Sequence, residues 1–422
     1  MLDIGATSIK SVVQKDKVLI KSSIKRADSF SAKYGNKISP DVVIREFLDH
    51  VEKQYDLYPF SEIWLCTEMH NFTACDEKKE VFSEFYSWRH VSKKSLDVRE
   101  EINDRYPDLT HTTGQSLHAG IPILNFSELM SSPNTYRILT LPELIIFKLG
   151  SLSGKIHSSM AASYGCYSPL KREWEVSILE KIYPELSLNF PEIFESNEEH
   201  LLGVIMIRGK EVQVYGGYGD MQTALLGTSL DDKAISINLG TGSQVAKIYK
   251  DINNINHSFD LKPFFGKFLA ARTHIPAGRS LDYLNQIIFK DKHFWTKLNN
   301  ITPQSLDGFS ELVEFDLNIF PGNWRYNQKN LELIKESNLS LDHMYIALIR
   351  VFCDQYIELL ELFQTQELEQ RVIISGGRLK EIPAVKDMFL QISCKVEYSE
   401  TEGIDETLLG LHKLSIKDRN AI

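Results

Sequence analysis

The sequence predicts an α/β protein made of two lobes. Its 422 residues are too many for one ordinary hydrophobic core, so two domains are the natural expectation. A strand–turn–strand pattern begins at residue 3 and another at residue 238, and both turns consist of small and hydroxyl residues. Helical and strand patterns alternate after each of them. We therefore expect an N-terminal lobe over residues 1–228 and a C-terminal lobe over residues 229–422.

The elements of the first lobe follow from local patterns. β-rich runs at 11–13 and 18–24 flank a charged turn, which predicts a hairpin. Apolar residues recur every fourth position in 41–53, which predicts a helix. The segment 150–156 is one residue short of a phosphate-binding GxxxxGK[ST] loop and lacks its last hydroxyl residue, so we expect a helix end and a loop. The other expected elements are strands at 63–67, 72–75 and 211–215, helices at 141–150 and 172–182, a helix from 221, and an irregular stretch at 76–135.

The second lobe repeats the opening of the first. Strands are expected at 234–239 and 244–249, on either side of a Gly-Thr-Gly-Ser turn. The amphipathic pattern at 341–363 predicts a long helix. A strand at 371–374 then runs into Ser375-Gly376-Gly377, and a helix is expected at 383–392.

Composition and charge exclude several classes of protein. The net charge of −10 disfavours nucleic acid and anionic membranes as partners. The five cysteines show no CxxC spacing, which is typical of free thiols in a reducing compartment. We see no secretory leader and no apolar run of 18 residues, so a cytoplasmic location is expected. Only two residues precede Asp3, so the first strand is expected to be very short.

The two glycine-containing turns carry the chemical argument. In Asp3-Ile4-Gly5-Ala6-Thr7-Ser8-Ile9-Lys10, a carboxylate at a strand end precedes Gly and hydroxyl residues, which can hold a hydrated cation and present N–H groups to phosphate. The stretch 238–245 has the same order of strand, turn and strand. Either turn alone is as consistent with a simple hairpin. Together they favour nucleotide phosphate binding, and the working hypothesis is an ATP-dependent small-molecule kinase.

Asp220 is the candidate general base of such a kinase. It follows a glycine-rich strand end and stands at the start of a predicted helix, where the helix dipole favours the ionised carboxylate. Asp is also a preferred helix cap, and on its own Asp220 is more simply interpreted that way. Its place shortly before the second turn favours the catalytic interpretation.

Four segments together resemble the FGGY carbohydrate kinases. They are residues 3–10, 219–224, 240–243 and 375–377, and they occur in the order found in that family. The resemblance implies two ribonuclease-H-like lobes of the actin-like ATPase type, with the active site in the cleft between them. Residues 238–244 and 274–281 look most like the sedoheptulokinase-like branch.

The resemblance also implies roles for individual residues. Asp220 would be the base that accepts the proton of the sugar hydroxyl, and Asp3 would orient Mg2+ through water. The expected cofactors are therefore ATP and Mg2+. The ATP-binding residues implied by the motifs are Gly5, Thr7, Ser8 and Lys10 on the phosphate path, Gly240, Thr241, Gly242 and Ser243 on the second lobe, and Gly376, Gly377 and Lys380 at the adenosine.

The sugar-binding motifs depart from the family. Family members often have Gln-Met-His-Gly where this chain has Glu68-Met69-His70-Asn71, and Trp-x-Asp-x-Arg where this chain has 88–92 without the aspartate. The expected substrate-binding residues are Glu68, Met69, His70, Trp88, Arg89 and Gln222. Because lost or gained polar contacts discriminate strongly between substrates, these changes affect the expected sugar more than the expected reaction.

The leading hypothesis is phosphorylation of a free ketose or polyol by ATP and Mg2+. A nucleotide-binding structural or regulatory protein on the same fold is the alternative, and a glycerol-type kinase is a weaker one. The expected partner is a small-molecule sugar or polyol, with neither nucleic acid nor membrane, and a homodimer is left open.

Overall fold

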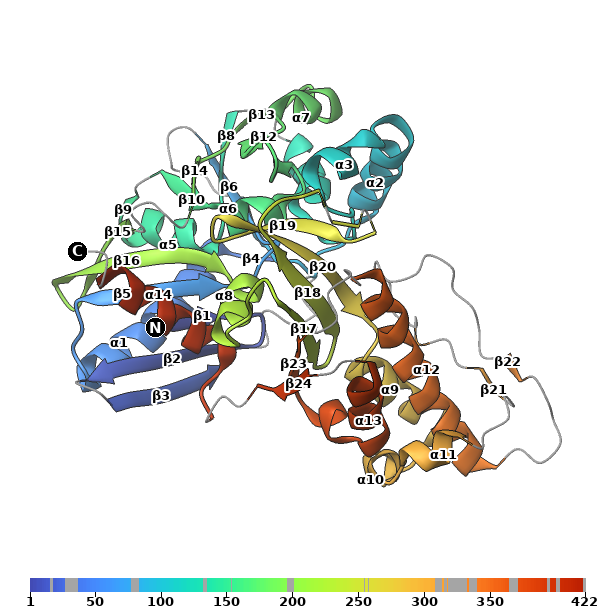
Figure 1. Ribbon diagram of the computed structural model, residues 1–422. Coiled ribbons are helices and arrows are strands. Elements are labelled where there is room, and N and C mark those ends of the chain that lie inside the picture. The colour runs from blue at the N-terminus through green and yellow to red at the C-terminus, as the bar shows by residue number, and fades with distance from the viewer. Residues whose placement is uncertain are drawn as a thin grey trace. The chain divides into compact units, whose positions relative to one another are not determined.

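The computed structural model describes most of the chain as two compact units (Figure 1). The first unit comprises Met1–Ser229, Leu261–Phe268 and Thr401–Ile422, and the second comprises Leu230–Asp260 and Leu269–Glu400. The first crossing thus lies one residue from the expected boundary, but the chain returns to the first unit twice. The residues outside the description are 16–17, 27–36, 77–82, 132–134, 153, 196–200, 254, 257, 308–312, 315–316, 318–331, 334–339, 364–370, 393–394, 400–402 and 420–422.

A mixed sheet forms the centre of the first unit. Its central strand β1 is antiparallel to β2 and parallel to β5, and β5 is in turn parallel to β16. In sheet order the strands are β3 (Val18–Lys25), β2 (Ser8–Lys15), β1 (Leu2–Ile4), β5 (Glu62–Thr67), β16 (Lys210–Gly219), β15 (Leu201–Ile207) and β9 (Gly150–Leu152). The very short first strand and the hairpin that follows it are both as expected.

Helices cover both faces of this sheet. Apolar residues of α1 (Pro40–Leu57) and α5 (Leu141–Leu149) share one core with Ile4 and Ile63. On the other face, α14 (Glu406–Arg419, red in Figure 1) packs Leu408, Leu411 and Leu414 against the sheet. Helix α8 (Asp220–Gly227) lies beside α14. The last helix of the chain therefore completes the unit that the first strand begins.

The remaining elements of the first unit are short. The helices are α2 (Lys93–Arg105), α3 (Asp108–Thr113), α4 (Pro122–Asn125), α6 (Ser158–Ala161) and α7 (Val176–Ile182), with 3-10 turns η3 (Phe126–Ser131) and η4 (Ala162–Tyr164). The short strands are β4 (Lys37–Ile38), β6 (Thr73–Asp76), β7 (Phe85–Tyr86), β8 (Thr135–Leu139), β10 (Lys155–His157), β11 (Tyr167–Ser168), β12 (Glu173–Trp174), β13 (Ser187–Asn189) and β14 (Glu192–Phe194).

Three expectations for this unit were wrong in detail. The stretch 76–135 contains α2, α3 and α4, so it is more regular than expected. The helix expected at 172–182 begins only at Val176, because Glu173 and Trp174 pair with β11. Within 150–156, where a helix end and a loop were expected, residues 150–152 belong to β9 and residues 155–156 to β10. Gly150 is required there, since a Cβ atom would lie 1.7 Å from the carbonyl oxygen of Val204 in the neighbouring strand.

The second unit has its own sheet and core. Its strands, in sheet order, are β19 (Asp260–Phe264), β20 (Lys267–Ile275), β18 (Ser243–Tyr249), β17 (Ala234–Leu239), β23 (Arg371–Gly376) and β24 (Lys395–Tyr398). Two further strands, β21 (Val313–Glu314) and β22 (Glu332–Leu333), pair with each other. The helices are α9 (Gly278–Leu284), η5 (Asn285–Phe289), α10 (Phe294–Asn299), α11 (Pro303–Asp307), α12 (Leu341–Leu362), η6 (Arg378–Glu381) and α13 (Pro383–Ile392).

The two sheets share one strand order. In each, a central strand is antiparallel to the strand that follows it and parallel to a later one, as β1 is to β2 and β5, and as β17 is to β18 and β23. A second parallel strand lies beyond, β16 in one sheet and β24 in the other. The repeated strand–turn–strand pattern of the sequence thus occupies equivalent places in two similar sheets.

A cavity of about 660 Å³ lies at the end of β1 in the first unit. The Met1 ammonium group donates a 2.9 Å hydrogen bond to the carbonyl oxygen of Val12 and lies at the cavity wall. Beyond it, β2 and β5 are the two neighbours of β1 and line the cavity from opposite sides, with His50 and Gln54 of α1 on one face. This cavity contains none of the predicted catalytic residues.

Two further properties agree with the sequence. Four cysteines are buried free thiols, namely Cys66, Cys75, Cys166 and Cys353. The fifth, Cys394, lies outside the described residues. Over the described part of the chain, none of the helices has both the length and the apolar character that a membrane crossing needs.

Candidate active site

The turn between β1 and β2 is held from both ends. Within it, the Gly5 amide donates to the Ser8 carbonyl oxygen at 3.0 Å. Arg26, the residue directly after β3, donates from Nη1 to the Gly5 carbonyl oxygen at 3.0 Å and from its backbone amide to the Thr7 carbonyl oxygen at 2.9 Å. Thr7 is exposed and Gly5 and Ser8 are half-buried, so the turn is open to a ligand while its backbone is fixed.

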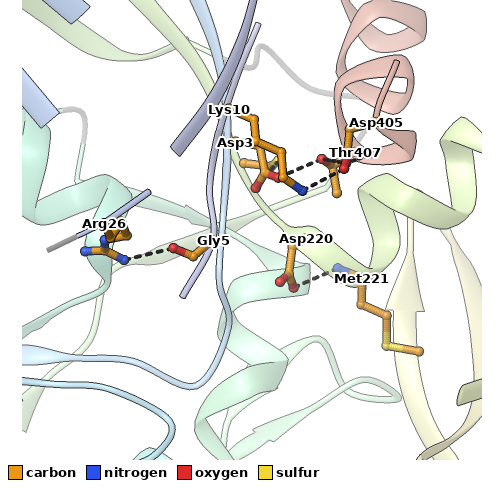
Figure 2. A network of polar contacts seen from close by, with 9 residues as sticks. Asp3, Gly5, Lys10, Arg26, Asp220, Met221, Asp405 and Thr407 are labelled. Atoms are coloured by element: carbon orange, nitrogen blue, oxygen red, sulfur yellow. Dashed lines mark hydrogen bonds and ion pairs between the residues drawn. The ribbon is translucent and has the colours of Figure 1, made fainter. Parts of the chain in front are cut away.

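Asp3 is buried beneath this turn. Its Oδ2 atom accepts a 2.8 Å hydrogen bond from the Thr407 hydroxyl and lies 3.8 Å from Nζ of Lys10 (Figure 2). Its Oδ1 atom accepts a long thiol hydrogen bond, 3.6 Å, from Cys66. Burial raises the pKa of Asp3 to about 6, and the Lys10 ammonium opposes that rise. Asp3 is thus a carboxylate with one oxygen held firmly and one held loosely.

Asp220 is the first residue of α8, directly after β16. Its Oδ1 atom accepts a 2.8 Å hydrogen bond from the Met221 amide, and the N-cap position is occupied by Gly219 and not by Asp220 (Figure 2). Burial and the nearby negative charges of Asp3 and Glu68 raise the pKa of Asp220 to about 7. A carboxylate with this pKa is suited to accept a proton near neutral pH.

The backbone before Asp220 is fixed on both sides. Ser159 Oγ accepts a 2.9 Å hydrogen bond from the Gly219 amide, and the Thr223 hydroxyl donates at 2.8 Å to the Gly219 carbonyl oxygen. A Cβ atom at Gly219 would lie 2.8 Å from Sδ of Met69, so only glycine fits without a shift. These contacts leave Asp220 little freedom to move away from its place at the helix start.

Glu68 follows β5 and is paired with Arg26. The Arg26 Nη1 atom donates at 3.1 Å to Glu68 Oε1, and both side chains are almost fully buried. The second oxygen of Glu68, Oε2, is buried and makes no hydrogen bond of normal length and angle with the described residues. Burial raises the pKa of Glu68, and the Arg26 charge opposes that rise. The same guanidinium thus joins the turn between β1 and β2 to a predicted sugar-binding residue.

Three more predicted sugar-binding residues are accessible. Trp88 and Arg89 are half-buried, with the guanidinium carbon of Arg89 4.9 Å from the centre of the Trp88 ring. His70 is half-buried and adopts a left-handed backbone, with φ 58°, and its Nδ1 atom lies 2.7 Å from the Ser163 carbonyl oxygen. An aromatic face and nearby polar atoms are a typical surface for a sugar.

The other two predicted sugar-binding residues point into the protein. Gln222 has no exposed surface, and its Nε2 atom donates a long 3.4 Å hydrogen bond to the Pro263 carbonyl oxygen. Met69 is also buried. Asn71, where the family often has Gly, accepts a 2.9 Å hydrogen bond from the first amide of α5, at Leu141. Of the six predicted sugar-binding residues, His70, Trp88 and Arg89 are thus half-buried, whereas Glu68, Met69 and Gln222 are buried.

The equivalent turn of the second unit is also exposed and anchored. Thr241 and Gly242 are exposed, and a Cβ atom at Gly242 would meet nothing within 4 Å. The start of α9 holds the turn, because the Gly278 amide donates at 3.2 Å to Gly240 and the Arg279 amide at 2.8 Å to Thr241. The Ser243 hydroxyl donates at 2.6 Å to the Asn238 carbonyl oxygen, and so the hydroxyl is already used.

A second glycine turn lies against the first one. Gly376 has φ 101°, and a Cβ atom there would lie 2.6 Å from the Leu239 carbonyl group. The neighbouring Gly377 is exposed and its amide donates at 3.0 Å to the Leu239 carbonyl oxygen. Lys380 is half-buried on η6, which follows directly. The second unit thus brings together all the predicted nucleotide-binding residues that it contains.

The site residues suit a Mg2+ ion that is held mainly by the phosphates of a nucleotide and by water. Among the described residues, no three His, Cys, Asp or Glu side chains form a group that could hold a metal by themselves. Mg2+ commonly keeps several waters and uses one or two carboxylates together with substrate phosphates. Asp3, with its loosely held Oδ1 atom just before the turn between β1 and β2, fits that arrangement.

The shared strand order and the paired glycine turns define a class of fold. The chain has the actin-like ATPase fold in the form found in sugar kinases, and the resemblance to FGGY carbohydrate kinases is confirmed at this level. The comparisons do not single out the sedoheptulokinase-like branch.

The similar proteins are sugar and polyol kinases. Among solved structures, a xylulose kinase from Lactobacillus acidophilus matches with a TM-score of 0.79 at 15% identity, over 100% of this chain and 89% of that one. A gluconate kinase from the same species matches with a TM-score of 0.80 at 14% identity, over 100% of this chain and 89% of that one. The glycerol kinase of Plasmodium falciparum with ADP matches with a TM-score of 0.72 at 15% identity, over 98% of this chain and 88% of that one.

One curated protein is also similar in sequence. The xylulose kinase of Staphylococcus xylosus is 22% identical over 329 residues, which is 71% of this chain and 66% of that protein, slightly under two thirds of its length. No protein-family model matches the chain. At these identities the likeness establishes the fold, and the residues described above carry the argument about function.

Proposed function

We propose that this protein is an ATP-dependent kinase that transfers the γ-phosphoryl group to a hydroxyl of a free sugar or polyol. The observation that carries the proposal is Asp220, a half-buried carboxylate with a pKa raised to about 7 at the start of α8. It is supported by the exposed glycine turns of the second unit and by the sugar and polyol kinases that share the fold.

Each residue of the proposed site has one role in the transfer. Asp220 accepts the proton of the sugar hydroxyl as the hydroxyl oxygen attacks the γ-phosphorus; the bond from that phosphorus to the β–γ bridging oxygen breaks, and ADP leaves. The fixed backbone at Gly219 keeps the carboxylate in place. In the second unit the backbone of residues 240–242 and 376–377 would bind the nucleotide, and in the first unit Lys10 would offer a positive charge to phosphates. When bound, Mg2+ neutralises the charge that builds up on the phosphate oxygens, and Asp3 would hold it through water.

We propose a ketose as the acceptor, with a five-carbon ketose as the first candidate. Xylulose kinases recur among the similar proteins, and heptuloses remain in the proposal because of the sequence motifs at 238–244 and 274–281. Glu68 differs from the amide that the family often has there, because an ionised carboxylate only accepts hydrogen bonds. Its buried Oε2 atom therefore selects for a hydroxyl that donates to it.

The alternative, a nucleotide-binding structural or regulatory protein, is less well supported. Such a protein has no need for a carboxylate with a raised pKa beside the phosphate turn. The named similar proteins are also enzymes of sugar and polyol phosphorylation.

The direct test is ADP release measured over a panel of ketoses, aldoses and polyols with Mg2+ and ATP. We expect release with at least one ketose to exceed the sugar-free rate by about a hundredfold or more, since an aligned acceptor and base together supply that much. Release that stays at the sugar-free rate for every acceptor would favour the alternative.

The pH dependence tests the base more specifically. The carboxylate of Asp220 accepts a proton only when it is ionised, so kcat/KM for the sugar should rise with pH and level off above about 7. The measurement is kcat/KM between pH 5 and 9 at saturating Mg2+ and ATP. A profile that is flat down to pH 5 would contradict the assignment.

A further inference from the structure

The first turn of α14 contacts the site from the far end of the chain. Thr407 Oγ1 lies 2.8 Å from Asp3 Oδ2, across a sequence separation of 404 residues. Asp405, just before the helix, accepts a 2.6 Å hydrogen bond on Oδ2 from the Lys10 ammonium group. Figure 2 shows these four side chains as one connected group. Neither Asp405 nor Thr407 is expected from the motifs at the start of the chain.

Asp405 and Thr407 also support each other. Asp405 Oδ1 accepts a 3.1 Å hydrogen bond from the Thr407 amide, which is the hydrogen bonding of a helix N-cap, and it also lies 2.6 Å from the Thr407 hydroxyl oxygen. The hydroxyl has one proton to donate, and it shares that proton between two carboxylates, those of Asp3 and Asp405. Since the cap fixes the start of the helix, it fixes where both side chains point.

The rest of α14 is locked onto α8, the helix that carries Asp220. A Cβ atom at Gly410 would lie 1.9 Å from the Thr223 carbonyl oxygen, so the two helices touch backbone to backbone. Lys413 Nζ donates at 3.0 and 2.9 Å to the Leu226 and Gly227 carbonyl oxygens at the end of α8. Helix α14 thus sets the place of the Asp3 and Lys10 side chains relative to α8.

The contacts decide how Asp3 and Lys10 are presented. The Thr407 hydroxyl holds Oδ2 of Asp3 and leaves Oδ1 with only the 3.6 Å thiol contact among the described residues. Lys10 lies 2.6 Å from Asp405 and 3.8 Å from Asp3, so Asp405 keeps the ammonium group from pairing closely with Asp3. An ammonium group in direct contact with Asp3 would compete with a cation for that carboxylate.

We propose that the start of α14 positions the two charged side chains that would bind the phosphates and Mg2+ in the first unit. Thr407 positions the Asp3 carboxylate, and Asp405, just before the helix, positions the Lys10 ammonium group. Both are positioning residues, since each acts through another side chain. The inference rests on the proposed nucleotide-dependent function and extends it to residues near the opposite end of the sequence.

The first test removes one hydroxyl. Thr407→Val keeps the shape of the side chain, and Thr407→Ser keeps the hydroxyl. The readout is the affinity for ATP by titration calorimetry, with Mg2+ and with EDTA. We expect Thr407→Val to lower the gain in affinity from Mg2+ by about tenfold or more, because a hydrogen bond to a charged group is lost, and Thr407→Ser to restore most of it.

A matched control separates positioning from general stability. Thr113 is a buried residue of α3 whose hydroxyl donates a 2.8 Å hydrogen bond to an uncharged acceptor, the Leu109 carbonyl oxygen. Thr113→Val should lower the melting temperature without changing the Mg2+ dependence. If Thr407→Val behaves like Thr113→Val, with lower stability and an unchanged gain from Mg2+, Thr407 is purely structural and the inference is overturned.

The second test removes the charge on Asp405. Asp405→Asn retains a good helix cap but releases Lys10 towards Asp3. We expect the Mg2+ concentration for half-maximal ATP binding to rise by about three- to fivefold, as suits a half-exposed ion pair. An unchanged Mg2+ requirement would contradict the role given to Asp405.

These binding measurements also distinguish the two proposals. A wild-type protein that binds ATP with Mg2+ but phosphorylates no sugar would refute the kinase while the Thr407 variants still decide the inference. A wild-type protein whose ATP affinity does not depend on Mg2+ would overturn the inference, whatever its activity on sugars.

Discussion

Asp220→Asn should abolish phosphoryl transfer while ATP binding persists. Asparagine keeps the size of the side chain and the acceptor for the Met221 amide, but it cannot take up the hydroxyl proton. We expect kcat to fall by about 10²–10⁴-fold, the range that a positioned general base contributes. The measurements are ADP release with the best acceptor of the panel and calorimetric titration with ATP and Mg2+.

A second helix supplies the control for this substitution. Asp108 is the exposed first residue of α3, so Asp108→Asn makes the same chemical change at another helix start, and it should leave kcat unchanged. Turnover in Asp220→Asn within about tenfold of the wild type would refute the base assignment, since the smallest general-base contribution is larger.

The same variant should be more stable than the wild type in alkaline solution. The Asp220 carboxyl group has its pKa raised from the ordinary 3.8 to about 7 in the folded protein. The unfolded chain therefore loses this proton at lower pH than the folded protein does. As the pH rises from the ordinary pKa to the raised one, the free energy of unfolding falls. Asparagine has no such penalty. The urea midpoint of Asp220→Asn should exceed that of the wild type at pH 8, with a much smaller difference at pH 4.

Arg26→Met should cause the largest loss of stability. The Arg26 and Glu68 side chains are 1% and 2% exposed, so removing the cation leaves a buried carboxylate without its charged partner. Breaking one side of a buried ion pair costs about 3–5 kcal/mol of unfolding free energy. The hydrogen bond from Arg26 to the Gly5 carbonyl oxygen is lost as well, so the turn between β1 and β2 loosens. Urea unfolding at pH 7 measures the loss.

A surface pair and a double variant test the explanation. Arg105 and Glu101 form an ion pair with side chains 70% and 40% exposed, and Arg105→Met should change the stability by less than about 1 kcal/mol. Adding Glu68→Gln to Arg26→Met should recover part of the loss, since the uncompensated charge disappears. No recovery in the double variant would show that the Arg26 contacts to Gly5 and Glu46 matter more than the pair with Glu68.

The parts of the site that sequence reasoning located are local. The turns at 5–8 and 240–242 lie between strands that are adjacent in the sequence, so spacing and residue type suffice to find them. Asp220 lies at a strand-to-helix junction that the glycine residues before it predict. The strand order common to both units was expected only from two eight-residue segments, and the structure extends that likeness to whole sheets.

The residues that sequence reasoning missed act over long distances. Arg26 follows a strand and has no distinctive sequence pattern around it, yet it contacts Gly5, Glu46 and Glu68. Thr407 meets Asp3 only because α14 folds back onto the first unit. One signal was available: Asp405 before Leu408 and Leu411 is a helix start with apolar residues three apart.

The sequence also did not show which side chains of the candidate site are buried. The position of Gln222 next to Met221 and Asp220 suggests a ligand contact, but on a short helix neighbouring residues face different ways. Gln222 faces the interior and Pro263, in a segment that returns from the second unit. The direction in which a side chain points depends on which elements cover the helix, and that information is spread over the chain.

The cavity at the end of β1 has a practical meaning for protein engineering. Met1 lines it, and burial lowers the pKa of its ammonium group to about 6. A residue joined to this nitrogen atom would replace its charge with an amide at the cavity wall, where β2, β5 and α1 are the neighbours. Apolar residues suit such contacts better than a run of histidines or charges does. The residue that precedes Met1, natural or added, therefore matters to the folding of the first unit.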